Sequence, residues 1–196
     1  MSAHPVDKFN ALATSSRQQP RYHRTINVLA ALLLLGFSTL FLSDWLGLRL
    51  NMTRSVAQGF YWVVNKPPEK GDFVSFCPAK NSLTQMAHER GYIGFGNCPG
   101  HYERLLKIVV GVSGDKVEQH KQGIYINGTL LPQSAVLPQD GLGRPLLPFS
   151  NTPIVLKSDE LWVMTNRSPL SFDSRYFGPI RLAQVSDVVK PLWTWR

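Results

Sequence analysis

Residues 105–117 read LLKIVVGVSGDKV, an apolar run that a turn sequence brings to an end. The aliphatic and β-branched side chains of Leu105–Val112 predict a buried strand, and Gly114-Asp115 predicts the turn after it. Lys107 is the one charged residue within this strand. Either it lies at a sheet edge with its ammonium in solvent, or apolar side chains enclose it.

Enclosure would change the chemistry of Lys107. Because desolvation disfavours the ammonium form, the pKa of a buried lysine can fall from about 10.4 to about 7. A neutral amine can take a proton from a serine hydroxyl, as histidine does in Ser-His-Asp enzymes. The sequence alone leaves both placements of Lys107 open.

The chain beyond residue 50 predicts a mainly β domain. Asn127-Gly128, within IYINGTLL, is a preferred two-residue type I′ turn between two apolar arms. Ser82–Arg90 is the one weak helical candidate in this part of the chain. Further short strands are predicted at Gly59–Val64, Asp72–Phe76, Lys116–His120, Ile154–Leu156, Leu161–Met164 and Leu182–Val189.

An uncharged apolar segment, Thr25–Ser43, precedes this domain. Its nineteen residues would rise about 28 Å as a helix, close to the roughly 30 Å hydrocarbon core of a bilayer. A core helix this uniformly apolar is unusual in so small a domain, and Ser43-Asp44-Trp45-Leu46 is a poor leader-cleavage site. We therefore predict an uncleaved transmembrane anchor helix at residues 25–45, in preference to a core helix or a cleaved leader.

Basic residues set the predicted orientation of this anchor. Arg17, Arg21 and Arg24 crowd its N-terminal flank. By the positive-inside rule, a disordered tail of residues 1–24 lies in the cytoplasm and residues 46–196 form a domain outside it. The lipid bilayer is thus a predicted partner.

The charge distribution argues against a nucleic-acid partner. Of the formal net charge of +8, residues 1–25 carry +3 and residues 51–196 carry +5. The basic residues of the domain are scattered, without a dense stripe or a basic helix. We expect no nucleic acid among the partners of this chain.

Two cysteines, Cys77 and Cys98, lie in the predicted exported domain. An oxidising compartment favours a disulfide between them, worth about 3 kcal/mol in the chain-entropy model. Because His88 and His101 lie nearby in sequence, a zinc site is the alternative, although this order of ligands fits no standard zinc spacing. We expect neither a metal nor a cofactor.

Three sequence boxes, in order, resemble those of bacterial type I signal peptidases. LLKIVVGVSGDKV matches a K-x-x-V-G-x-x-G-D-x-V run that begins at a catalytic lysine. KGDFVSF (residues 70–76) resembles the strand after the nucleophile, and SFDSRYFGP (residues 171–179) resembles an S-x-D-S-R-Y-x-G box. The resemblance covers most of residues 50–190 and implies a signal-peptidase-like β domain with one N-terminal transmembrane helix.

Other features resemble the conjugative-transfer branch of that family, the TraF-type peptidases that mature pilin subunits. These are S-x-x-x-G-F-Y-W from Ser55, a Cys-containing insert (residues 77–104) with RGYIGFGNCPG, and the terminal PLWTW. The resemblance implies a periplasmic serine endopeptidase on the bacterial inner membrane. Its substrate would be a membrane-bound pilin or another leader-bearing precursor, which is hydrolysed or cyclised.

The resemblance also implies roles for single residues. Ser55, just beyond the predicted anchor, would be the acylated nucleophile, and Lys107 its general base. Thr53 and the Ser55 N–H would hold the oxyanion, and Ser171 would orient the lysine.

Asp173 and Arg175 match a pair that braces the site in this family. In the conjugative branch the aspartate also has a direct catalytic role, which the resemblance extends to Asp173. Without the resemblance, an Asp–Arg pair at the surface of a turn would be the ordinary reading.

This chain departs from the family pattern in two places, and the first departure supports a non-catalytic reading. Val56-Ala57 stands where relatives have Met-x-Pro or Met-Pro, and Thr165–Leu170 replaces a G-D-N-R-D-N run. A non-catalytic, single-pass assembly component of the conjugation apparatus is therefore one alternative. A self-cleaving Ser–Lys repressor that binds DNA is a second, against which the predicted anchor and the lack of a helix-turn-helix sequence argue.

Overall fold

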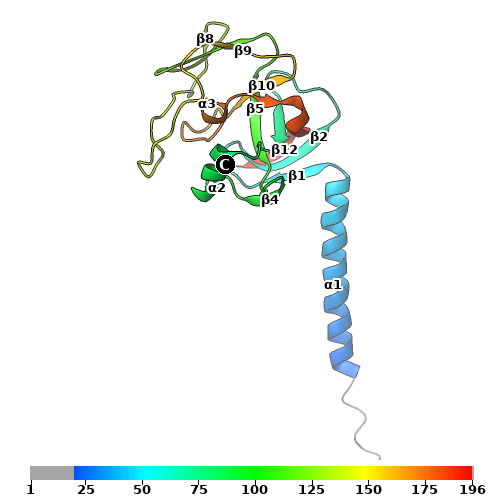
Figure 1. The fold of residues 1–196 in the computed structure, drawn as a ribbon. Helices are drawn as coiled ribbons and strands as arrows, with labels where there is room; N and C mark the ends of the chain where they lie inside the picture. The colour runs from blue at the N-terminus through cyan, green and yellow to red at the C-terminus, as the bar shows by residue number, and fades with distance from the viewer. Residues whose placement is uncertain (1–19, 196) are drawn as a thin grey trace, which may run out of the picture. The chain divides into compact units, whose positions relative to one another are not determined.

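The computed structural model describes the backbone of residues 20–195, which fall into two units that meet between Leu46 and Gly47. The first unit contains helix α1 (Pro20–Trp45) (Figure 1). Residues 1–19 of the predicted tail lie outside the described residues. The helix begins at Pro20, five residues before the predicted start, because proline is well accepted in the first turn of a helix. Among the described residues, no helix combines the length and hydropathy that crossing a membrane requires.

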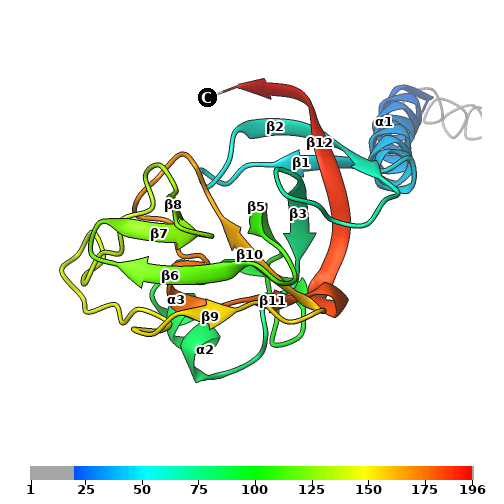
Figure 2. The same ribbon diagram turned by 90° about the horizontal axis from the view of Figure 1, so that it is seen from above.

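The second unit is mainly β, as predicted, and all of its described strands except β4 (Phe95–Cys98) form two antiparallel sheets (Figure 2). The larger has the order β1-β2-β12-β3-β5-β10-β11 and the smaller β8-β7-β6-β9. The strands of the larger sheet are β1 (Leu48–Asn51), β2 (Gln58–Val64), β12 (Val185–Trp195), β3 (Phe73–Phe76), β5 (Leu105–Gly111), β10 (Glu160–Met164) and β11 (Ile180–Arg181).

The smaller sheet contains the predicted hairpin. Asn127 and Gly128 both have positive φ, 52° and 80°, as a type I′ turn requires. The strands of this sheet are β8 (Thr129–Leu130), β7 (Gly123–Ile126), β6 (Lys116–His120) and β9 (Ile154–Val155). Three further elements are α2 (Ser82–Glu89), which confirms the helical candidate, β4 (Phe95–Cys98) and α3 (Ser174–Phe177).

The prediction of a last strand at Leu182–Val189 is wrong at both ends. Leu182–Gln184 form a 3₁₀ turn, because the Gln184 side chain accepts a hydrogen bond from the Arg181 N–H and donates one to the Cys77 carbonyl. β12 then continues to Trp195, beyond the predicted end. The pairing of β12 with β2 shifts register between Pro191 and Trp193, which accommodates a proline without a donor N–H.

Strand β5 lies inside the larger sheet, paired with β3 on one side and β10 on the other. Its residues alternate between buried and half-buried, and Leu105, Lys107 and Val109 belong to the buried row. Leu105 and Val109 pack into the main apolar core with Val74 and Phe172. The sheet therefore points the Lys107 side chain into the protein rather than into solvent.

Candidate active site

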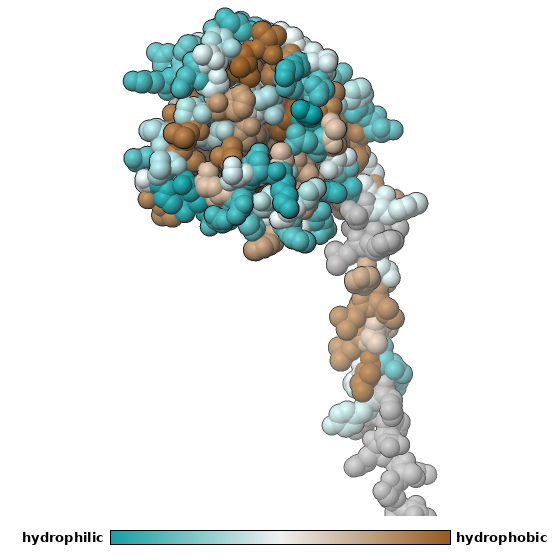
Figure 3. Space-filling model, viewed as in Figure 1, coloured by the Kyte–Doolittle hydropathy of each residue, from teal (hydrophilic) through white to brown (hydrophobic). Residues whose placement is uncertain are grey.

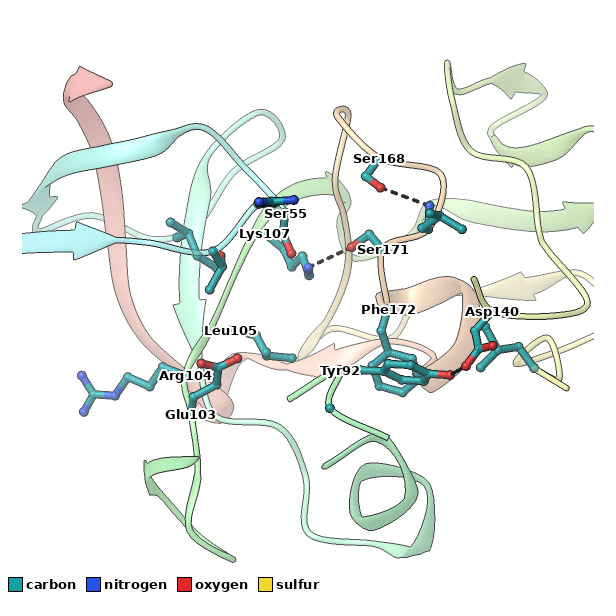
Figure 4. Close-up of a pocket in the computed structure, with 16 residues that line it drawn as sticks. Ser55, Tyr92, Glu103, Arg104, Leu105, Lys107, Asp140, Ser168, Ser171 and Phe172 are labelled. Carbon is teal, nitrogen blue, oxygen red and sulfur yellow. Dashed lines mark hydrogen bonds between the residues drawn. The ribbon is translucent and has the colours of Figure 1, made fainter. Parts of the chain in front are cut away.

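Lys107 is enclosed, with 2 % of its surface exposed. The sheet-edge placement is wrong, because β5 has a hydrogen-bonded neighbour on each side. The Lys107 Nζ donates a hydrogen bond of 2.9 Å to the Ser171 Oγ (Figure 4). The serine thus fixes the direction in which the amine points.

Burial lowers the pKa of Lys107 from 10.5 to about 8. The charge of Asp173 opposes this shift, that of Arg175 adds to it, and that of Glu103 opposes it. Desolvation dominates, as expected for an amine among apolar side chains. About a tenth of the Lys107 side chains would be neutral at pH 7, so a base is present at neutral pH.

Ser55 lies in the turn between β1 and β2, and Asn51 holds this turn together. The buried Asn51 Nδ2 donates to the carbonyls of Thr53 and Ala57, at 3.1 and 3.0 Å. The Asn51 Oδ1 accepts from the Thr53 N–H and from the Thr53 hydroxyl, at 3.1 and 2.7 Å. One amide side chain therefore makes four hydrogen bonds across the turn that carries Ser55.

Two more hydroxyl groups fix the backbone around Ser55. The Thr165 hydroxyl donates to the Ser55 carbonyl, and the Tyr61 hydroxyl donates to the Ala57 carbonyl at 2.6 Å. Val56, which stands in the region where relatives have proline, is buried against Tyr61. Sequence reasoning missed these contacts, since Thr165 is 110 positions from Ser55. They supply the rigidity that proline would otherwise give to the turn.

The Thr53 hydroxyl, the predicted oxyanion donor, points its proton at Asn51 in this structure. A hydroxyl has one proton, so Thr53 must turn away from Asn51 before it can donate to an oxyanion. Thr53 nonetheless lines the same cavity as Ser55. Its predicted role therefore needs a rotation of the hydroxyl when substrate binds.

Asp173 and Arg175 form a fully buried ion pair, not a surface one. Both have 0 % exposure, and the Asp173 carboxylate accepts from the Arg175 Nε and from a terminal guanidinium nitrogen, each at 2.8 Å. The guanidinium also donates to the carbonyls of Ala135, Pro169 and Ser171. Arg175 thereby holds the loop that presents Ser171 to Lys107, which agrees with the bracing role.

A cavity of about 350 Å³ brings most of these groups together. Its wall comes from the turn at 53–55, the stretch at 103–107 and the loop at 168–172, with Tyr92 and Asp140 on a further side. Ser55 and Lys107 both face it, and Figure 4 shows them on neighbouring parts of the wall. Asp173 and Arg175 do not line it. Ser55 and Lys107 both belong to the described residues, and no direct hydrogen bond joins them; in many enzymes such a bond forms only when substrate binds.

The Cys-containing insert forms one side of this cavity through Gly91, Tyr92 and Glu103. Cys77 and Cys98 are joined by a disulfide, as predicted, with their Cα atoms 5.4 Å apart. Both sulfurs are consumed by that bond, so the zinc alternative loses its thiolate ligands. The His88 ring instead contacts the Ile93 carbonyl and packs edge-on against Phe95.

Comparison with known proteins assigns the class. The family model described as signal peptidase, peptidase S26, matches residues 21–194. A plasmid transfer protein TraF of Escherichia coli is 42 % identical over 166 residues, which cover 85 % of this chain and 91 % of that protein. A probable conjugal transfer protein TraF of Sinorhizobium fredii is 36 % identical over 177 residues, covering 83 % and 90 %.

The chain therefore belongs to the peptidase S26 family of signal peptidases, and within it to the TraF type. A solved signal peptidase I from Enterococcus faecalis is a more remote match, with 22 % identity and a TM-score of 0.36. The match spans 64 % of this chain and 98 % of the Enterococcus chain, and its TM-score is too low to support a conclusion about this protein.

Proposed function

We propose that this chain is a membrane-anchored serine endopeptidase that processes an exported precursor with a Ser–Lys dyad. Ser55 is the nucleophile and Lys107 its general base. The observation that carries the proposal is the Lys107 amine, which is buried, has a pKa of about 8, and faces the same cavity as Ser55. A lysine with a purely structural role would not stabilise the fold from such a position, because burial disfavours its charged ammonium form.

The proposed reaction is acyl transfer. The neutral Lys107 amine takes the proton of the Ser55 hydroxyl, and the Ser55 oxygen attacks the scissile carbonyl. The Ser55 N–H and the Thr53 hydroxyl stabilise the oxyanion, each such donor being worth about 10²–10³ in rate. The Lys107 ammonium then protonates the leaving amine. Water then hydrolyses the acyl-enzyme and releases a linear product, or an amine of the acylated precursor attacks the ester at Ser55 and releases a cyclic product.

The proposed substrate is the pilin, or another leader-bearing protein, of a conjugative transfer system. The relatives that support this are named as plasmid or conjugal transfer proteins. Hydrolysis and cyclisation differ only in what reaches the ester at Ser55. Both require the same serine and the same lysine.

Membrane attachment is the second part of the proposal. We infer that Thr25–Ser43 is the anchor. The N-terminus of the chain then lies in the cytoplasm and the β domain in the periplasm. Some side chains of this segment lie outside the described residues. Figure 3 shows the described side chains of α1 as mostly hydrophobic. Within the β unit, Leu50, Trp62 and Trp193 are exposed on three neighbouring strands, as expected of a surface near lipid headgroups.

Co-expression with a candidate pilin precursor tests the proposal. The precursor should become shorter with the wild-type chain and stay intact with Ser55→Ala. Intact mass then separates the two products, because a cyclic product is lighter by one water than the linear form. Equal processing by both chains would assign cleavage to another enzyme. No processing by either, with no labelling of Ser55 by a fluorophosphonate, would favour the non-catalytic assembly component.

Cleavage is expected to rise with pH, because only the neutral amine of Lys107 can act as a base. With a pKa of about 8 for Lys107, kcat/KM should increase about tenfold per pH unit below that value and level off above it. The measurement is the pH profile of kcat/KM for a peptide that spans the cleavage site. A profile that is flat from about pH 6 to about pH 9 would contradict the assignment of the base.

A further inference from the structure

Glu103 is a second charged residue in the wall of the active-site cavity. It lies just before β5, and every residue from Glu103 to Lys107 contributes to the cavity wall, with Glu103, Leu105 and Lys107 spaced two residues apart. Residues two apart on an extended chain point to the same side. Figure 4 shows the Glu103 carboxylate below Leu105, on the stretch that continues into Lys107.

The insert is built to leave room for Glu103. The Glu103 N–H donates to the Gly94 carbonyl at 2.8 Å. A Cβ atom at Gly94 would come within 2.7 Å of a Glu103 carboxylate oxygen, and one at Gly96 within 2.6 Å of the Glu103 Cα. Gly94 and Gly96 therefore let the preceding part of the insert pack directly against Glu103.

Other charges in the cavity wall do not neutralise Glu103. Asp140 accepts hydrogen bonds from Arg144, at 2.6 Å, and from the Tyr92 hydroxyl. Arg104 points the other way and has its guanidinium 3.9 Å from Asp187 (Figure 4).

Arg54 is an exposed cation on the rim of the cavity. Among the side chains that the structure describes, none forms a hydrogen bond or ion pair with the Glu103 carboxylate. The cavity thus offers a negative charge that the protein itself leaves without a direct partner.

Strand geometry sets the reach of this charge. Glu103 and Lys107 are four residues apart on an extended chain, which corresponds to about 13 Å. A substrate that lies extended along the same wall, with its scissile carbonyl at Ser55, would place a residue three to five positions from the cut beside Glu103.

We propose that Glu103 forms a subsite for a cationic group of the precursor, either a basic side chain or a free α-ammonium, about four residues from the scissile bond. This inference deepens the proposed function and rests on it. A charge-assisted hydrogen bond at a half-buried site should favour the cationic substrate about tenfold over a neutral one.

Paired peptides that span the cleavage site test this subsite. Each pair differs only in lysine or glutamine at one position, three to five residues on either side of the cut, and one further pair has a free or an acetylated N-terminus. The full-length wild-type chain should prefer the cationic member of one pair about tenfold in kcat/KM. Glu103→Gln should bring that ratio close to one, and Glu103→Lys should invert it, so that the glutamine peptide is the better substrate.

The ratio within a pair removes a side effect of these substitutions. Glu103 also raises the pKa of Lys107, so its loss shifts the pH profile, but both peptides of a pair then meet the same lysine. Glu69→Gln is the matched control, since Glu69 is an exposed carboxylate that does not line the cavity. Equal ratios in wild type and Glu103→Gln for every pair would overturn the subsite.

A binding measurement keeps this test separate from the proposed function. Fluorescence anisotropy of short alanine-rich peptides with a single lysine or a single glutamine needs no cleavage. If no peptide is cut, the peptidase proposal fails, and anisotropy still decides about Glu103. Binding that prefers lysine in wild type but not in Glu103→Gln supports the subsite, whereas equal binding of both peptides rejects it.

Discussion

Replacing Lys107 with arginine is expected to abolish cleavage, although the positive charge is kept. A guanidinium has a pKa above 12 and cannot lose its proton near neutral pH, so it cannot accept one from Ser55. Loss of general-base catalysis should lower kcat by about 10⁴, the upper end of what such a base contributes. The measurement is single-turnover cleavage of the precursor at about pH 8, where about half of the wild-type amine is neutral, and at about pH 10, where nearly all of it is neutral.

Lys107→Met is the matched control, because methionine is unbranched and apolar. It should lose as much activity as Lys107→Arg, yet fold at least as well as wild type. The lowered pKa of Lys107 means that the folded state binds this proton less well than the unfolded state does. Stability therefore falls as pH drops from about 10.5 through about 8, and at pH 7 the penalty reaches about 3 kcal/mol.

Removing the amine should relieve part of that penalty. Urea unfolding at neutral pH should show Lys107→Met as more stable than wild type, with the difference shrinking above pH 10. Cleavage by Lys107→Arg at more than a hundredth of the wild-type rate would remove Lys107 from the role of base.

Local sequence patterns predicted the parts of this fold that depend on near neighbours. The apolar run of β5, the type I′ turn at Asn127-Gly128 and the helix at Ser82–Glu89 each follow from residues within a few positions of one another. The Cys77–Cys98 disulfide followed from the cysteine count and the prediction of an oxidising compartment. Such signals are local, and they hold whatever the order of strands in the sheet.

The placement of Lys107 could not be predicted locally, because it depends on strand order. β3, about thirty residues earlier, pairs with one side of β5, and β10, about fifty residues later, pairs with the other side. Only these long-range pairings make β5 an interior strand. The support of the Ser55 turn by Thr165 is hidden for the same reason. Asn51, four residues before Ser55, was the one supporting residue near enough to be suspected, since asparagine commonly bonds its own turn.

Replacing Asp173 with asparagine is expected to lower the free energy of unfolding by about 3–5 kcal/mol. The substitution leaves the Arg175 guanidinium, which has 0 % exposure, without the carboxylate that balances its charge. Removing one partner of a buried ion pair costs more than removing both, because an uncompensated charge stays in the interior. Urea unfolding of the β unit, followed by tryptophan fluorescence, measures this loss.

Activity of the same variant separates bracing from direct catalysis. The Asp173 charge raises the pKa of Lys107, so its removal should shift the rise of kcat/KM to lower pH. If Asp173 only braces the site, folded Asp173→Asn should keep its activity above about pH 9 within about tenfold of wild type. A direct catalytic role would instead cost about 10²–10⁴ at every pH. Arg175 donates hydrogen bonds to both carboxylate oxygens of Asp173, and Asp173 does not line the cavity. We therefore expect folded Asp173→Asn to keep its activity above about pH 9, as a bracing role predicts.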